Sequence, residues 1–389
     1  MKTNLLTVLL LLTLLIISCR KERVIGSTAY ITKPLKDSVQ AIVDKYIGLG
    51  IPGIEVAVKD DHDFFTTNGG YSSLEEHTPM NLAGTDWIFS ITKTYTAVLL
   101  MKEVEKGSIN LDGKIRNYLS APYADNIVGS DVVTVRMLLN HTSGIIDFSA
   151  LPEFIEEQFK HPLQQPSVKE KIELIYGHPL AFQPGTDFSY CNTNYLLLHV
   201  ILENVTGKSY ESLLRSEIIQ PLQLKNTWYG IGDEQIKNLK FPNYYFDPQA
   251  SGELLNATAW NIALGNTSLG YGGIAAQAAD VIKFYKALIN GDVVSKKSFK
   301  EMTAWIQGKG SYQPDYGLGI EYYQFAPGTT AQFGHEGDGV GATTQIMYVP
   351  DTHVYLYINC TVGRKIPGPF LYKTTDFKNE LCAFVAKWR

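Results

Sequence analysis

Strand-like segments lie near both ends of this chain of 389 residues, and the long stretch between them has helical spacing. Apolar residues alternate at 54–58, and 64–71 follows a turn as the partner strand of a hairpin. Strand patterns return at 316–323, 332–335, 342–349 and 353–358. We therefore predict an α+β fold, in which an antiparallel sheet built from both termini is flanked by helices and a mostly helical lobe is inserted.

Helices are predicted on either side of this insert and within it. Helical spacing occurs at 35–49, 280–289 and 376–388, from Phe89 to Gly107, and over most of 110–270. We expect a domain at 34–389, with an α/β lobe of about 34–86 and 272–389 and a helical lobe of about 87–271. A cleft between the lobes is the expected place for a site.

Composition limits the possible partners. The net charge is -5 and the sequence pI is about 5.9, which argues against nucleic acid. Four cysteines in 389 residues exclude a disulfide scaffold. The eight histidines have no metal-binding spacing, and no glycine-rich phosphate loop follows a strand, so we expect no metal and no cofactor.

The N-terminal segment is typical of a secretory leader. Lys2 precedes an apolar run at 5–17, which is too short to span a bilayer. The run ends at Ser18-Cys19, which resembles a bacterial lipobox; a plain signal peptide with a chance cysteine is the alternative. We predict a lipoprotein signal peptide at 1–18, lipidation of Cys19, and a tether at 19–33. The protein would then be anchored outside the cytoplasmic membrane, in the periplasm or at the outer membrane.

Three cysteines remain after Cys19, an odd number for an oxidising compartment. A bridge between Cys360 and Cys382 is one open pairing. Cys191 would then be a free thiol, most simply a small packed residue.

Ser90 and Lys93 form the first candidate catalytic pair along the chain. Residues at i and i+3 share a helix face, so the amine lies beside the hydroxyl, and a helix N-terminus favours negative charge there. A buried ammonium loses its proton more easily, so Lys93 could activate Ser90 as a base. The alternative for Lys93 is a solvated lysine on a helix face.

Two further short motifs follow along the chain. Tyr190 and Asn192 lie two residues apart; a phenol near an ammonium would have a lowered pKa and could relay a proton. Tyr357 and Asn359 have the same spacing but lie in an apolar strand, where a core position is the better interpretation. His335 lies in a glycine-rich segment, 334–339, that by itself is better interpreted as a simple turn with one exposed histidine.

The three motifs occur in this order and are accompanied by longer segments: 138–145 (LLNHTSGI), 184–195 (PGTDFSYCNTNY), 272–280 and 316–319. Together they resemble the serine β-lactamase and penicillin-binding-protein superfamily, specifically its class C β-lactamase and D-alanyl-D-alanine carboxypeptidase branch. The resemblance extends from about Pro34 to the C-terminus. It implies that Ser90 is the acylated nucleophile, Lys93 its activating partner and Tyr190 the proton shuttle.

The resemblance also implies the residues that bind substrate. Asn192 would bind the acyl-side amide, and His335 and Gly337 would lie along the substrate. The backbone N–H groups of Ser90 and Asp338 would form the oxyanion hole, in which a single donor typically contributes about 2.7–4 kcal/mol.

One departure from the family pattern affects substrate choice. Class C β-lactamases typically carry Lys-Thr-Gly where this chain has His335-Glu336-Gly337. A neutral imidazole and an anion replace two groups suited to a carboxylate. Glu336 would repel a substrate carboxylate unless strand alternation turns its side chain away from the cleft.

The resemblance therefore implies a serine hydrolase that forms an acyl-enzyme at Ser90 and hydrolyses D-alanyl peptides or related amides and esters. A class C-type β-lactamase is the alternative enzyme, disfavoured by the missing Lys-Thr-Gly. A non-hydrolytic penicillin-binding sensor of the cell wall is the alternative of another kind, disfavoured by the presence of Tyr190 and Asn192. Expected partners are a small peptide, ester or β-lactam substrate and peptidoglycan, and the expected state is a monomer.

Overall fold

The computed structural model describes residues 32–81, 84–308, 314–324, 331–363 and 368–388. The predicted signal peptide, Cys19 and most of the predicted tether lie outside these residues. Helix α2 (Thr32–Gly48) begins within the last two residues of that tether. None of the helices in the described part has both the length and the apolar character to cross a membrane.

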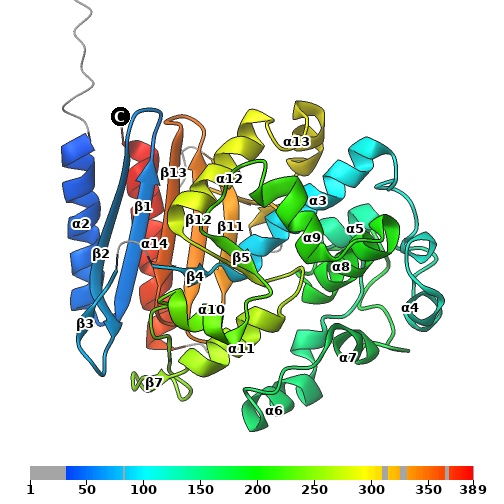
Figure 1. Cartoon of the computed structure of the whole chain (residues 1–389), viewed down its shortest axis with the longest axis horizontal. Coiled ribbons are helices and arrows are strands. Elements are labelled where there is room, and N and C mark those ends of the chain that lie inside the picture. The colour runs from blue at the N-terminus through cyan, green and yellow to red at the C-terminus, as the bar shows by residue number, and fades with distance from the viewer. Residues whose placement is uncertain (1–31, 82–83, 309–313, 325–330, 364–367, 389) are drawn as a thin grey trace, which may run out of the picture.

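The centre of the fold is an eight-stranded sheet that joins the two ends of the chain (Figure 1). Its order is β3-β2-β1-β13-β12-β11-β10-β9, and β1 pairs antiparallel with β13 so that Val56 lies opposite Ile358. The predicted antiparallel sheet built from both termini is therefore confirmed. Its strands are β1 (Gly53–Lys59), β2 (Phe64–Ser73), β3 (Thr78–Pro79), β9 (Asp315–Tyr316), β10 (Glu321–Tyr323), β11 (Gln332–Asp338), β12 (Thr343–Val349) and β13 (Val354–Cys360).

Helices cover both faces of the sheet. On one face α2 packs with α14 (Pro369–Lys387), and Ile54, Val56 and Val58 of β1 belong to the same apolar cluster. On the other face α12 (Ala278–Asn290) packs on β1 and β13. Because strand side chains alternate, β1 supplies apolar groups to both layers and is buried along almost its whole length.

The middle of the chain is mostly helical, as predicted, and packs beside the sheet (Figure 1). Its centre is α3 (Thr92–Lys106) against α8 (Asn192–Thr206), two helices whose residues are largely buried. A three-stranded sheet joins this part to the rest: β4 (Asp86–Trp87), β8 (Ile274–Ala276) and β5 (Thr227–Tyr229). The remaining elements that matter below are η1 (Phe89–Ile91), η3 (Phe148–Ala150), α6 (Pro152–Lys160), α7 (Val168–Glu173) and α11 (Thr258–Thr267). The predicted lobe boundaries stay a prediction.

Two expectations differ from the structure. The segment 316–323 is two strands, because Gly319 turns with φ 75° and brings Glu321 back opposite Tyr316. An added Cβ at Gly319 would lie 2.6 Å from Ala97 Cβ, so the turn sits directly on α3. The pairing of Cys360 with Cys382, which the sequence left open, is not formed, since Cys360 at the end of β13 and Cys382 on α14 are both free, buried thiols.

Candidate active site

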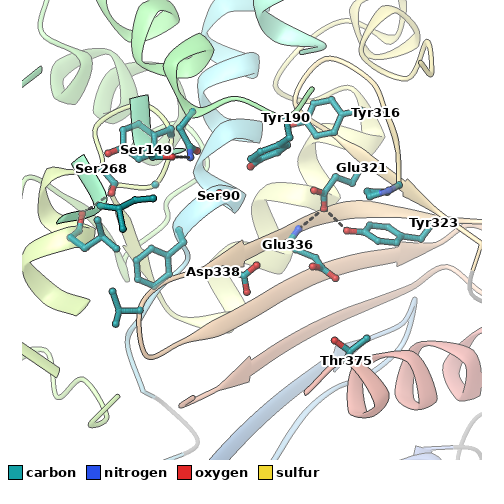
Figure 2. Close-up of a pocket in the computed structure, with 18 of the residues that line it drawn as sticks. Ser90, Ser149, Tyr190, Ser268, Tyr316, Glu321, Tyr323, Glu336, Asp338 and Thr375 are labelled. Atoms are coloured by element: carbon teal, nitrogen blue, oxygen red, sulfur yellow. Dashed lines mark hydrogen bonds between the residues drawn. The ribbon is translucent and has the colours of Figure 1, made fainter. Parts of the chain in front are cut away.

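A pocket of about 1070 Å³ lies between strand β11 of the large sheet and the helical part of the chain (Figure 2). Ser90, Tyr190 and Asn192 line it, together with Asp338 at the end of β11. The structure thus gathers the separate sequence motifs around one cavity.

Ser90 is held at a sharp turn where strand β4 leads into helix α3. The turn is the 3-10 segment η1, and the residue before the serine, Phe89, has φ 43°. A positive φ is uncommon for a bulky residue, so the backbone at Phe89 is strained and must be held in this conformation by its surroundings. Phe89 is buried, so packing of its ring fixes the serine at the pocket floor.

Lys93 lies one turn further on and is fully buried. Its Nζ donates to Ser90 Oγ at 2.9 Å, to Asn192 Oδ1 at 2.9 Å and to the Tyr271 carbonyl oxygen at 3.0 Å. Three acceptors match the three N–H bonds of an ammonium group. The Tyr190 ring lies 4.8 Å from Nζ, which adds a cation–π contact. The solvated-lysine alternative is therefore wrong.

Tyr190 forms a hydrogen bond with Ser90. Burial first, and the charge of Glu321 next, raise the pKa of Tyr190 well above its ordinary value of 10.0. The predicted lowering of this pKa by a nearby ammonium is wrong, because desolvation of the phenolate outweighs the attraction of the cation. Tyr190 is consequently a neutral phenol at neutral pH and has a proton to donate.

Asn192 is oriented by partners at both ends of its side-chain amide. Its Oδ1 accepts from Lys93, while Nδ2 donates to Ser149 Oγ at 3.0 Å and to Asp147 Oδ2 at 3.2 Å. Asp147 Oδ2 also accepts the Asn192 backbone N–H at 3.1 Å. Asp147 is a functional residue that sequence reasoning missed, since nothing in its spacing connects it to Asn192, 45 residues later.

His335 lies behind the pocket wall and is fully buried. Its Nδ1 lies 2.6 Å from the Glu336 carbonyl oxygen and its Nε2 lies 2.8 Å from the Tyr316 hydroxyl. Burial, and then the Lys93 charge, hold the pKa of His335 well below 6.5, so the ring is neutral. The structure places the Tyr316 ring, and not His335, among the pocket-lining groups, and contact of His335 with substrate stays a prediction.

Gly337 lets β11 approach the serine turn. A Cβ at this position would lie 2.2 Å from the Ile88 carbonyl oxygen, two residues before Ser90. That Gly337 lies along the substrate stays a prediction; the geometry shows that its missing side chain makes room for the chain's own backbone. The close approach brings Asp338 and Ser90, whose N–H groups are the predicted oxyanion donors, into the same cavity.

Glu336 lines the pocket, so alternation does not remove it from the cleft. Its Oε1 lies 2.8 Å from Nζ of Lys378, a lysine of α14 that is only 2% exposed. A buried ion pair offsets most of the field of each charge. Lys378 therefore reduces the repulsion that we expected between Glu336 and a substrate carboxylate. No short sequence motif contains this lysine.

His141 and Cys191 pack beneath Tyr190. His141 Nδ1 accepts the Cys191 backbone N–H at 3.2 Å, and its ring centroid is 4.5 Å from that of Tyr190. Burial lowers the pKa of His141 and raises that of Cys191, so both are neutral. Both support the Tyr190 loop, and for Cys191 this agrees with its interpretation as a small packed residue.

Comparison with known proteins agrees with this geometry. The profile of the Beta-lactamase family matches residues 39–368. The chain belongs to the beta-lactamase family. Penicillin-binding protein 4* of Bacillus subtilis is 26% identical over 302 residues, which are 75% of this chain and 64% of that protein. The chain thus spans slightly less than two thirds of that relative's length.

Solved structures of other proteins superimpose on this fold. A D-stereospecific amidohydrolase from Streptomyces has a TM-score of 0.73 and 25% identity, over 84% of this chain and 94% of that one. D-amino acid amidase from Ochrobactrum anthropi, complexed with D-phenylalanine, has a TM-score of 0.79 and 23% identity, over 92% and 100%. With the serine, lysine and tyrosine described above, the chain has the fold and the reactive groups of a serine hydrolase of the beta-lactamase family.

Proposed function

We propose that this protein hydrolyses small amides and esters, D-alanyl peptides or related D-amino-acid amides among them, through an acyl-enzyme at Ser90. The observation that carries the proposal is the hydrogen-bonded set around Ser90 Oγ, which receives a hydrogen bond from Lys93 and shares another with Tyr190. The names of the relatives, a penicillin-binding protein and D-specific amide hydrolases, support the substrate class.

Acylation follows from these contacts. Ser90 Oγ attacks the carbonyl carbon, and its proton passes to the Tyr190 oxygen while the Tyr190 proton passes to the leaving group. The bond from the carbonyl carbon to the leaving nitrogen or oxygen then breaks, and the acyl group remains on Ser90. The Lys93 ammonium stabilises the negative charge that develops on Oγ as its proton leaves, and burial keeps Tyr190 a neutral phenol between the two transfers.

Deacylation reverses the proton path. A water molecule attacks the acyl carbon and gives its proton to Tyr190, whose own proton returns to Ser90 Oγ. Donors at the Ser90 and Asp338 N–H groups would hold the carbonyl oxygen in both steps. The path needs a neutral phenol, which agrees with the raised pKa of Tyr190.

Turnover on four substrates tests the proposal: a D-alanyl-D-alanine peptide, a D-amino-acid amide, a short-chain nitrophenyl ester and a chromogenic cephalosporin. We expect hydrolysis of the ester and of at least one amide or peptide, lost in Ser90→Ala and kept in Ser216→Ala, an exposed serine outside the pocket. Efficient turnover of the cephalosporin alone supports a β-lactamase instead. Labelling at Ser90 without turnover of any of the four supports the sensor.

We also propose that the protein is lipid-anchored outside the cytoplasmic membrane. The proposal is supported by Lys2, the apolar run at 5–17 and Cys19 at its end. Expression with radiolabelled palmitate should label the wild type in the membrane fraction, and Cys19→Ser should release an unlabelled protein. A labelled Cys19→Ser variant would contradict the anchor.

A further inference from the structure

A second buried lysine lies close to the active site. Lys171 of α7 is 1% exposed, and its Nζ donates to the Thr267 carbonyl oxygen at 2.7 Å. Burial lowers the pKa of Lys171 to about 7, although the charge of Glu170 acts in the opposite direction. An ammonium group in this position destabilises the fold, because it has left water. The proposed reaction steps do not use this lysine.

The carbonyl group that Lys171 binds is at the end of helix α11. Thr267 is the last residue of that helix. The last four carbonyl groups of a helix have no partner within it, and they carry the negative end of the helix dipole. A cation with N–H donors satisfies both needs. Lys171 therefore fixes the point at which the chain leaves α11.

Beyond α11 the chain forms part of the pocket wall. Ser268 and Tyr271 both line the cavity, and Figure 2 shows Ser268 to one side of Ser90. Ser268 also forms a hydrogen bond with Tyr271. Lys171 thus holds one end of a short stretch of wall, which we call the 267–271 segment.

Lys93 holds the other end of the 267–271 segment. Its Nζ donates to the Tyr271 carbonyl oxygen at 3.0 Å and to Ser90 Oγ at 2.9 Å. The Tyr271 ring lies near both lysines, with its centroid 5.6 Å from Lys93 Nζ and 5.8 Å from Lys171 Nζ. A shift of the segment would therefore move an acceptor of the same ammonium group that contacts the nucleophile.

Other titratable groups also face the 267–271 segment. Burial raises the pKa of Tyr271, and it lowers that of His199, which lies against Gly270 from helix α8. The phenol and the imidazole are therefore neutral near neutral pH. The charge of Asp147 acts on Tyr271. Against these groups, a change of charge on Lys171 alters the electrostatics of the segment directly.

We propose that Lys171 is a positioning residue of the reaction. Its ammonium group holds the 267–271 segment in place, and the carbonyl group at the other end of the segment keeps Lys93 directed at Ser90. This inference rests on the proposed function, and Lys171 itself is not among the described residues that line the pocket. A charge-assisted hydrogen bond is roughly twice as strong as a neutral one, so the segment is held less firmly once Lys171 loses its proton.

Hydrolysis of the short-chain nitrophenyl ester tests the proposal in Lys171→Met, a substitution that removes the charge and the N–H donors. At about pH 6 we expect kcat to be about tenfold below that of the wild type, the effect of one hydrogen bond to a charged group. At about pH 8.5 the difference should be about threefold, because the wild type has then lost the charge on Lys171 as well. Lys208→Met, at an exposed lysine beyond α8, should match the wild type at both pH values.

Urea unfolding at about pH 6 separates this role from a purely structural one. In the unfolded chain Lys171 keeps its proton up to its ordinary pKa of 10.5, and in the fold only up to about 7, so the retained charge lowers the stability of the fold at this pH. Lys171→Met should then be at least as stable as the wild type and nevertheless slower. A less stable variant, or the same rate difference at both pH values, would overturn this inference alone. Hydrolysis that survives Ser90→Ala, or none by the wild type, would overturn the proposed function instead.

Discussion

A buried carboxyl pair joins strand β1 to β4, the strand that leads to Ser90. Glu55 of β1 and Asp86 of β4 are each 1% exposed and hydrogen-bond to each other. Asn359 Nδ2 donates to Asp86 Oδ1 at 2.7 Å. Burial raises the pKa of Asp86 to about 7 and raises that of Glu55 well above 4.5, so the pair keeps a proton near neutral pH.

The pair should make the protein less stable as pH rises. In the unfolded chain Asp86 loses its proton near its ordinary pKa of 3.8, whereas in the fold it does so at about 7. Its contribution to stability is therefore complete below the unfolded pKa and is lost as pH rises through the folded one. With about 1.4 kcal/mol per pKa unit, the loss between about pH 5 and about pH 8 is on the order of 2–3 kcal/mol from Asp86 alone.

Urea unfolding at several pH values measures this loss. We expect the wild type to lose on the order of 2–3 kcal/mol of unfolding free energy between about pH 5 and about pH 8, relative to Asp86→Asn. In that variant the new amide can donate to Glu55, which removes the need for the proton. Asp37→Asn, exposed on α2, should keep the wild-type pH dependence. Parallel curves for the wild type and Asp86→Asn would refute the reasoning.

Three further predictions concern catalysis. Tyr190→Phe should lower kcat for amides by about 10²–10⁴-fold and for nitrophenyl esters much less, because nitrophenolate leaves without a proton; equal losses would contradict the shuttle. Gly337→Ala should lower kcat by about 10²–10³-fold in steady-state assays, because the added Cβ would lie 2.2 Å from the Ile88 carbonyl oxygen. Gly48→Ala, whose Cβ would meet nothing within 4 Å, should leave kcat unchanged. Full activity of Gly337→Ala would refute the close approach. Asp147→Asn should cost about tenfold in kcat/KM by releasing Asn192, and an unchanged value would show that its hydrogen bonds are dispensable.

The parts of the site that lie close together in sequence were predictable. The i, i+3 spacing of Ser90 and Lys93 places amine and hydroxyl together on any helix, and the structure joins them at 2.9 Å. The sheet built from both termini was also predictable, because alternating strands flank a helical stretch. In both cases the prediction depends on the spacing of residues that are close in sequence, and this spacing sets the same geometry in any helix or strand.

The parts that depend on tertiary contacts were not predictable. The strand expected at 316–323 breaks because α3 leaves room only for a glycine turn at Gly319. Lys378 on the C-terminal helix pairs with Glu336, which is 42 positions earlier in the chain. Glu321, whose charge raises the pKa of Tyr190, lies 131 residues beyond that tyrosine. Desolvation, which reverses the expected pKa shift of Tyr190, likewise depends on burial that no local pattern encodes.

The central claim is a covalent acyl group on Ser90 during turnover. Rapid quenching of the enzyme with an excess of the short-chain nitrophenyl ester, followed by intact-protein and peptide mass measurement, tests it directly. The account predicts the mass of the ester's acyl group on the peptide that contains Ser90, absent from Ser90→Ala and longer-lived in Tyr190→Phe. Turnover without any such adduct in both the wild type and the slow Tyr190→Phe variant, or an adduct located on another residue, would contradict it.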